Sequence, residues 1–196
     1  MDWRVFKAIY DVSLHDHWVG TLFSDIETAS IPLMIVITGL LWFLSRPGGG
    51  RKWKLACGSA YASAALAYAV AFVIHHIWAR PRPYMTHDIA HPWSNTTDAS
   101  FPSDHSTASF AIAVAVVMFD PIAGAIFLVI AAIISVGRLF IGAHYPSDVG
   151  TGIIVGTVAA VLVVRLLRPF VRWVVSYVER LTDPLVARVY PNRPVT

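Results

Sequence analysis

Long apolar stretches, separated by short polar segments, run along most of the chain. Five of them have the character of membrane-crossing helices; they cover residues 28–45, 53–79, 103–119, 121–142 and 147–167. The second stretch has 27 residues, and at ~1.5 Å per residue a helix of that length measures about 40 Å, enough to cross a bilayer with tilt. The pattern predicts an all-α integral-membrane helical bundle with about five transmembrane helices.

The two ends of the chain have a different pattern, in which bulky apolar residues recur at helical spacing between charged ones. Near the N-terminus the apolar set is Trp3, Val5, Phe6, Ile9 and Tyr10, and the charged set is Arg4, Lys7 and Asp11. Near the C-terminus Trp173, Val174, Tyr177, Val178 and Leu181 alternate with Arg172, Glu179 and Arg180. Such amphipathic helices lie in the membrane interface, so we expect interfacial N- and C-terminal helices beside the bundle.

The composition agrees with a membrane protein of one domain, residues 1–196. Hydrophobic residues make up 56% of the chain and charged residues 14%, against roughly 45–50% and about 25% in soluble domains. The single cysteine, Cys57, excludes an internal disulfide. The first 20 residues lack the continuous apolar core of a cleavable signal peptide, so we expect insertion to rely on the internal spans. We expect the bilayer as a partner and no nucleic acid.

The distribution of charge orients the predicted bundle. The connection after the first span contains Arg46, Arg51, Lys52 and Lys54 without an acid, and Arg165, Arg168 and Arg172 follow the fifth span. Positive residues mark cytoplasmic loops. Residues 80–102 and 138–148 then face outward. The segment up to residue 27, with five acids against two basic residues, also fits the outside.

The outward connection near residue 140 contains a histidine and a carboxylate at helical spacing. His144 and Asp148 are four residues apart, with a proline between them that suits a helix start. A carboxylate on one imidazole nitrogen would fix the tautomer and leave the other nitrogen free to attack phosphorus. Arg138 offers a planar fork for phosphate oxygens. Alternatively, His144 is an ordinary interfacial residue and Asp148 only a helix-start carboxylate.

A second polar motif, Pro102-Ser103-Asp104-His105, opens the third apolar stretch. Free backbone N–H groups at a helix start bind anions. Ser103 can add its hydroxyl, and His105 can serve as a proton donor or base. Because a carboxylate would repel phosphate, we expect the backbone N–H of Asp104 to face the site and its side chain to turn away. The alternative is an ordinary serine cap.

The third motif, Arg80-Pro81-Arg82-Pro83, ends the second span. Prolines on both sides of Arg82 stiffen its backbone, which suits a fixed phosphate contact. For Arg80 the favoured interpretation is an arginine that snorkels to the interface. His75 and His76 lie one or two turns earlier, where histidines are unusual; a functional role and a hydrogen bond inside the bundle are equally compatible with this position.

Other polar and small residues receive structural interpretations. Gly152 and Gly156 suit close helix packing, and Trp78, Trp93, Trp173 and Tyr177 suit interface anchors. A metal site built from His87, Asp88, His91 and Asp98 is disfavoured, because these residues lack tight ligand spacing. We therefore expect no metal and no cofactor.

Taken together, the three motifs resemble those of the type-2 phosphatidic-acid phosphatase family of integral-membrane lipid phosphatases. That family has a lysine seven residues before Arg-Pro, then Pro-Ser-Gly-His, then Ser-Arg followed by His and Asp. Here Arg82-Pro83 matches the first motif, and the spacing of Arg138, His144 and Asp148 matches the third. The chain departs at His75 for the lysine, Asp104 for the glycine and Gly137 for the serine. The Pro-Ser-Asp-His form looks like the bacterial branch that dephosphorylates undecaprenyl pyrophosphate.

The resemblance implies a two-step reaction without metal. His144, held by Asp148, attacks the terminal phosphorus, and His105 protonates the leaving oxygen and later activates water. The residues expected to hold the phosphate are Arg82, Ser103, Asp104 through its amide, Arg138 and His75 in place of the lysine. The implied partner is a prenyl pyrophosphate lipid, and the implied location is the bacterial plasma membrane with the site on its outer side.

Three other functions remain open on the sequence. The same chemistry could act on phosphatidylglycerophosphate, phosphatidate or another prenyl phosphate, because a lipid tail contacts generic apolar helices. A proton-coupled transporter could use intramembrane histidines and arginines, but the polar groups gather at one mouth instead of along a path. A vanadate-dependent peroxidase shares the anion pocket, and the short membrane-embedded chain disfavours it.

Overall fold

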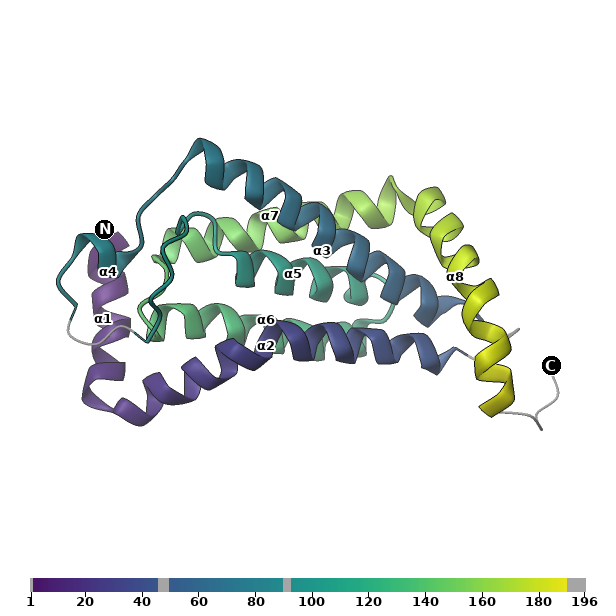
Figure 1. Cartoon of the computed structure of the whole chain (residues 1–196), viewed down its shortest axis with the longest axis horizontal. Coiled ribbons are helices and arrows are strands. Elements are labelled where there is room, and N and C mark those ends of the chain that lie inside the picture. The colour runs from purple at the N-terminus through teal and green to yellow at the C-terminus, as the bar shows by residue number, and fades with distance from the viewer. Residues whose placement is uncertain (1, 46–49, 90–92, 190–196) are drawn as a thin grey trace.

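The computed structural model describes residues 2–45, 50–89 and 93–189, which form eight helices (Figure 1). Their bounds are α1 Asp2–His15, α2 His17–Leu44, α3 Lys52–Ile77, α4 Pro83–Thr86, α5 Asp104–Val117, α6 Pro121–Phe140, α7 Pro146–Arg165 and α8 Arg168–Val189. Arg46 and His91 lie outside the described residues. The predicted all-α membrane bundle with helices at both ends is confirmed.

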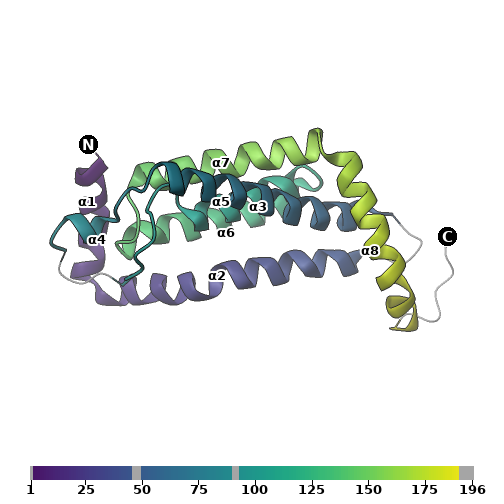
Figure 2. The ribbon, with the colours of Figure 1, turned by 45° about the horizontal axis from the view of Figure 1, so that its top comes forward.

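Four of the described helices, α2, α3, α6 and α7, are long and apolar enough to cross a membrane. They run side by side along the long axis (Figure 2). The third predicted span is shorter than expected: α5 has 14 residues, about 21 Å, whereas a crossing takes about 20 residues. Helix α5 lies between α3, α6 and α7. Its surface therefore contacts protein on several sides, and it need not match the thickness of the bilayer.

Two glycines allow α7 to approach α5 closely, as their spacing predicted. A Cβ on Gly156 would lie 2.3 Å from the carbonyl oxygen of Thr107, and one on Gly152 would lie 2.7 Å from that of Ser103. Only glycine fits such contacts. The backbone N–H of Ser103 also donates to the carbonyl oxygen of Asp148 at 3.0 Å. The starts of α5 and α7 are thus held together.

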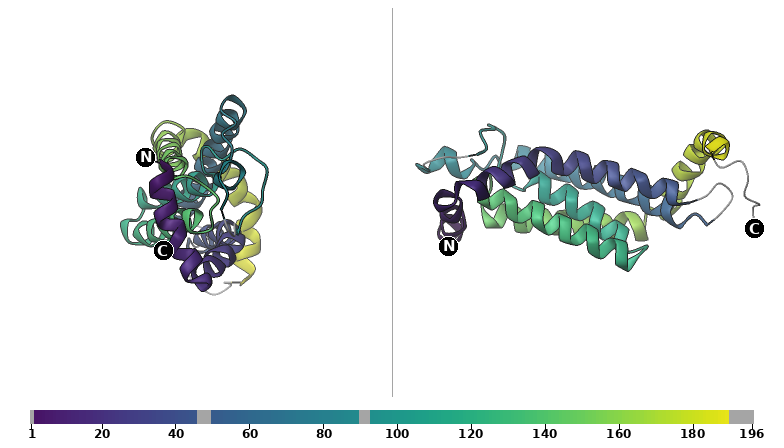
Figure 3. Two further views of the ribbon diagram at one scale, coloured as in Figure 1. Left: turned by 90° about the vertical axis from the view of Figure 1, so that its left-hand side faces the viewer. Right: turned by 90° about the horizontal axis from the view of Figure 1, so that it is seen from below.

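Helix α1 lies across one end of the bundle, almost perpendicular to the spans (Figure 3). Its buried Phe6 and Tyr10 pack against Tyr145 at the start of α7. Helix α2 begins at His17 and not at residue 28, so the outer polar segment predicted before the first span is already helical. This end of the molecule is therefore a packed layer of α1, the first turns of α2 and the connecting loops.

Helix α8 lies across the opposite end (Figure 1). Val171 and Val175 are buried, and Arg51 at the start of α3 pairs with Glu179 of α8 at 2.7 Å. Trp173 and Tyr177 are exposed, as suits interface anchors. As its amphipathic pattern predicted, α8 packs Val171 and Val175 against the bundle and leaves Trp173 and Tyr177 exposed.

Candidate active site

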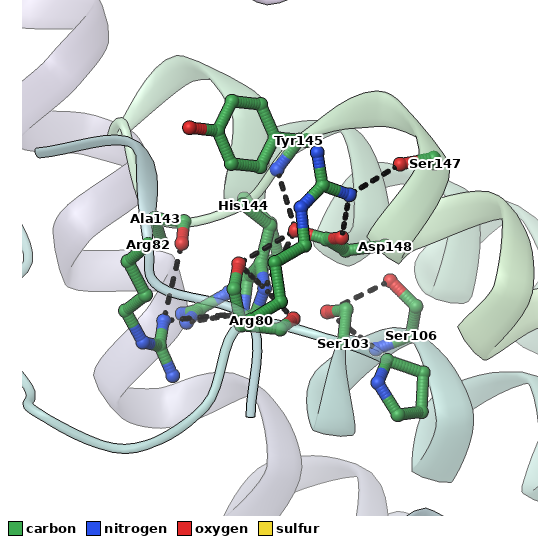
Figure 4. Close-up of polar contacts among 12 residues, drawn as sticks. Arg80, Arg82, Ser103, Ser106, Ala143, His144, Tyr145, Ser147 and Asp148 are labelled. Atoms are coloured by element: carbon green, nitrogen blue, oxygen red, sulfur yellow. Dashed lines mark hydrogen bonds and ion pairs between the residues drawn. The ribbon is translucent and has the colours of Figure 1, made fainter. Parts of the chain in front are cut away.

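The three predicted motifs meet at the end of the bundle that α1 covers. They come from the loop after α3, the start of α5 and the connection between α6 and α7 (Figures 1 and 4). The last connection turns at Gly142, whose φ is 78°, a left-handed conformation that favours glycine. This turn brings His144 back beside Arg138 of α6.

The imidazole of His144 is buried, and its two nitrogens have distinct partners. Nδ1 lies 2.8 Å from the carbonyl oxygen of Ser100. Because a carbonyl only accepts, Nδ1 carries the proton and donates it there. Nε2 then keeps a lone pair, which accepts from a guanidinium nitrogen of Arg82 at 3.3 Å and from one of Arg138 at 3.2 Å. The nitrogen available to attack is Nε2, and two cations flank it.

The electrostatic surroundings keep this ring neutral. Burial, together with the positive charges of Arg138 and Arg82, lowers the pKa of His144 well below 6.5. A neutral imidazole is the form that can act as a nucleophile. The same arginines that would bind phosphate oxygens therefore also keep the neighbouring nitrogen unprotonated.

Asp148 reaches the imidazole through an intermediate residue. Its Oδ2 lies 3.9 Å from His144 Nδ1, which is too long for a hydrogen bond. Oδ2 instead accepts the Ser100 hydroxyl at 2.6 Å and the backbone N–H of Tyr145 at 2.8 Å. The sequence predicted a carboxylate directly on the ring; in the structure Ser100 supplies the acceptor and Asp148 holds Ser100.

Arg80 does not snorkel, contrary to the favoured interpretation. Its guanidinium donates to Oδ1 of Asp148 at 2.6 Å and to the Ser147 hydroxyl at 2.7 Å (Figure 4). Its carbonyl oxygen accepts the backbone N–H of Ser100 at 2.8 Å. Arg80 thus contacts both residues that orient His144. Ser100 itself went unpredicted, because a serine in a loop has no distinguishing spacing.

Each of the two arginines that contact His144 is also paired with an acid from a different segment. Arg82 donates to the Asp98 carboxylate at 2.9 Å and to the carbonyl oxygen of Ala143 at 3.2 Å. Arg138 pairs with Glu27 of α2. Burial alone would raise the pKa of Asp98, but the hydrogen bond from Thr96 and the charge of Arg82 lower it. Neither Glu27 nor Asp98 was predicted to belong to this site.

Ser103 and its neighbours lie at the start of α5, beside Asp148. The buried Ser103 hydroxyl caps the helix by accepting the backbone N–H of Ser106 at 3.5 Å, which leaves its own proton free for another acceptor. His75 donates to the carbonyl oxygen of Pro102 at 2.9 Å. It therefore contacts the motif itself, at the place where the sequence suggested a phosphate contact.

The Asp104 side chain turns toward His75, whose Nε2 lies 3.6 Å from Oδ1. That oxygen is buried without a hydrogen-bond partner in the described part of the chain. His105 follows it on the first turn of α5 and is half-buried; burial and the charges of Arg138 and Arg82 lower the pKa of its ring to about 3, so the ring is neutral in the free protein. Among the described residues its ring makes no hydrogen bond, so both nitrogens are available for proton transfer.

Two of the residues considered for a metal site, His87 and Asp98, have other partners. His87 stacks on Trp3 with ring centroids 3.6 Å apart, and Asp98 pairs with Arg82. Across residues 2–45, 50–89 and 93–189, no group of three histidine, cysteine or acidic residues is placed to hold an ion. The charge around His144 Nε2 is supplied by arginines.

Comparison with known proteins identifies a family and several proteins that are similar to this chain. The family description "PAP2 superfamily" matches residues 56–172, more than half of the chain. Undecaprenyl-diphosphatase BcrC of Bacillus subtilis (strain 168) is 28% identical over 191 residues, which cover 96% of this chain and 97% of that protein. Decaprenylphosphoryl-5-phosphoribose phosphatase of Mycolicibacterium smegmatis is 39% identical over 109 residues, covering 56% of this chain and 57% of that protein.

A solved structure has the same fold. The crystal structure of Aquifex aeolicus LpxE superposes with a TM-score of 0.66 at 21% identity, covering 84% of this chain and 94% of that one. At this identity the likeness concerns the fold alone. The residues matched by the family include all three motifs that meet around His144.

Proposed function

The chain belongs to the PAP2 superfamily and is a multi-pass membrane lipid phosphatase; from this premise we propose that it hydrolyses the terminal phosphate of undecaprenyl pyrophosphate to give undecaprenyl phosphate. One observation carries the chemistry: the unprotonated Nε2 of His144 lies between two arginines. The similarity to an undecaprenyl-diphosphatase along nearly the whole chain supports the substrate. The reaction would recycle the carrier lipid of cell-wall synthesis.

In the first step Nε2 of His144 attacks the terminal phosphorus. A phosphorus–nitrogen bond forms and the bond from that phosphorus to the bridging oxygen breaks, which gives a phosphohistidine and the lipid monophosphate. Once the negative charge of the bound phosphates offsets that of Arg82 and Arg138, His105 would bind a proton, which it donates to the leaving oxygen. The Nδ1 proton stays on its hydrogen bond to Ser100, so the ring is stabilised as it gains positive charge.

In the second step water replaces the histidine on phosphorus. His105, now neutral, takes a proton from the water, and the phosphorus–nitrogen bond breaks to release inorganic phosphate. Arg82 and Arg138 stabilise the charge on the equatorial oxygens in both steps. The free hydroxyl proton of Ser103 and the backbone N–H of Asp104 complete this set at the start of α5. The reaction as written needs no metal.

The site would face the outer side of the bacterial plasma membrane. Arg51 and Lys52 lie at the start of α3, at the opposite end of the bundle from the start of α7; Arg51 bonds Glu179 of α8, and Lys52 pairs with Asp120. Positive residues favour the cytoplasm, which leaves the α1 end outside. A lipid held by the exposed apolar surfaces of the spans would present its pyrophosphate at this end.

Purified protein in detergent should release phosphate from undecaprenyl pyrophosphate, and EDTA should leave the rate unchanged. The same assay is run on a panel of other lipids: decaprenylphosphoryl-5-phosphoribose, phosphatidylglycerophosphate and phosphatidate. A preference for one of these would overturn the proposed substrate while keeping the chemistry. Loss of activity on chelation, or failure to trap an acid-labile phosphoenzyme on His144 with radiolabelled substrate, would overturn the mechanism.

A further inference from the structure

The carboxylate of Asp2, at the first residue of α1, contacts the network behind His144. Its Oδ1 accepts the backbone N–H of Ser147 at 3.1 Å, and its Oδ2 accepts the Ser147 hydroxyl at 2.6 Å. Oδ2 also pairs with a guanidinium nitrogen of Arg80 at 2.8 Å. One side chain therefore binds both the first turn of α7 and the arginine that holds Asp148.

Arg80 is held between two carboxylates and an aromatic ring. Asp148 takes one guanidinium nitrogen at 2.6 Å, Asp2 takes another at 2.8 Å, and the guanidinium carbon lies 4.0 Å from the centre of the Tyr145 ring. Without Asp2, one edge of this guanidinium would face the solvent, because the Arg80 side chain is 26% exposed. A long arginine side chain that loses an anchor gains rotamer freedom.

We propose that Asp2 is a positioning residue for the hydrolysis, acting through Arg80; this inference rests on the proposed function. Asp2 holds Arg80, Arg80 holds Asp148 and the Ser100 backbone, and Ser100 accepts the Nδ1 proton of His144. Each link is a direct hydrogen bond or ion pair, although Asp2 and His144 are far apart in sequence. The helix predicted only to lie on the membrane thus supports the reacting imidazole.

The ionisation of the two groups suits this role. Partial burial would raise the pKa of the Asp2 carboxyl, but hydrogen bonds from Ser147 and Arg80 outweigh it and hold the pKa below its usual range. Burial would lower the pKa of Arg80, but its bonds to Asp2 and the charge of Asp148 raise it. Both groups therefore carry their charges at neutral pH, and charge-assisted hydrogen bonds of this kind are the strong ones.

Contacts other than those of Asp2 also hold α1 against the bundle. Phe6 and Tyr10 stack with ring centroids 5.5 Å apart, and Phe6 also contacts the Tyr145 ring at 5.8 Å. Trp3 stacks on His87 at 3.6 Å. Since these aromatic contacts bury the apolar face of α1, an isosteric change at Asp2 should leave the helix in place and affect only the contacts of Asp2 with Arg80 and Ser147.

The test compares Asp2→Asn with Asp11→Asn in the full chain, in detergent. Asp11 lies on the same helix and pairs with Lys7, exposed, at 2.6 Å, so it is a matched control. We expect Asp2→Asn to lower kcat about tenfold, with KM within about twofold, as for residues that orient a functional imidazole without touching the substrate. Asp11→Asn should leave both constants unchanged. Asp2→Glu should recover part of the lost rate.

A double-mutant cycle separates action through Arg80 from a general loosening of the fold. In an Arg80→Gln background the further change Asp2→Asn should alter kcat less than about twofold, because coupled residues are not additive. Equal effects in both backgrounds, a wild-type rate for Asp2→Asn, or a rate loss that follows a fall in Tm would each overturn the proposal.

The readouts use two substrates, undecaprenyl pyrophosphate and p-nitrophenyl phosphate, a water-soluble phosphate monoester. A wild-type protein that cleaves only the soluble ester would contradict the proposed lipid and leave the Asp2 comparison intact. A wild-type protein that cleaves the lipid, with an Asp2→Asn variant as fast as wild type, would contradict only the role of Asp2.

Discussion

The two ends of the bundle use the same kinds of charged residue in different surroundings. At the α8 end Arg51 pairs with Glu179, and its side chain is 41% exposed. At the α1 end Arg82 and Arg138 pair with Asp98 and Glu27, and both arginine side chains are only 4% exposed. At the first end an arginine ties one helix to another, whereas at the second two arginines converge on one imidazole nitrogen.

This difference shows how burial decides what an ion pair does. Exposed pairs contribute about 0–1 kcal/mol to stability. Breaking a buried pair costs about 3–5 kcal/mol, because the remaining charge has no partner. Lys54 shows that a buried cation also occurs at the α8 end. It pairs with Asp183 of α8 at 2.7 Å, but among the described residues it contacts no histidine ring.

The largest expected effect comes from the nucleophile. His144→Gln should lower kcat by roughly 10⁴-fold or more, the order seen when a covalent nucleophile is removed. Phosphate release from undecaprenyl pyrophosphate measures it. His76→Gln is the matched control, since His76 is exposed and, among the described residues, its ring contacts only Phe72, whose carbonyl oxygen it bonds at 2.8 Å. A His144 variant that keeps most of its rate would remove this assignment.

The second prediction tests the two ends directly. Arg138→Gln should lower kcat by about 10²–10³-fold, because it removes a preorganised charge from the phosphoryl oxygens. Arg51→Gln should leave kcat unchanged and alter the free energy of unfolding by less than about 1 kcal/mol. A similar fall in kcat in both variants would mean that the difference in burial does not explain the different roles of the two arginines.

A smaller effect is expected at the residue between Asp148 and the ring. Ser100→Ala removes the hydroxyl that donates to Asp148 at 2.6 Å but keeps the carbonyl that accepts from His144. We expect kcat to fall about tenfold. Ser176→Ala, which removes an acceptor of Arg51 at the α8 end, should leave kcat unchanged. An unchanged Ser100→Ala rate would indicate that the carbonyl alone orients His144.

The smallest change is a shift in pH dependence. Because burial and the two arginines lower the pKa of His144, the ring stays neutral as the pH falls through 6.5. The acid limb that this nucleophile gives to kcat/KM should therefore lie below pH 6.5, and Arg138→Gln should move it upward. In the unfolded chain the ring binds a proton as the pH falls below its ordinary pKa of about 6.5, whereas in the folded chain it stays neutral. The free energy of unfolding therefore decreases as the pH falls below that value. Measuring kcat/KM across pH checks the position of the acid limb, and measuring the unfolding midpoint across pH checks the fall in stability.

Much of the site could be predicted because its chemistry lies in short contiguous motifs. Arg82, Arg138 and His144 were each marked by a neighbouring proline or by fixed spacing, and both arginines contact Nε2 of His144. The contribution of Glu27 was hidden, since one acid near the start of a span resembles any interfacial carboxylate. Arg80 was misinterpreted for the same reason: its two acceptors, Asp2 and Asp148, come from segments that are distant in sequence.

The order of apolar and polar residues by itself determined the helical bundle, the clustering of the motifs at one mouth and the amphipathic helices at both ends. These features depend on periodicity and on transfer of side chains from water to lipid, which are local properties. Only the tertiary structure decided that α5 is an enclosed short helix, that Ser100 stands between Asp148 and His144, and that α1 reaches the site. Those outcomes depend on hydrogen-bond distances between remote segments, which no local pattern encodes.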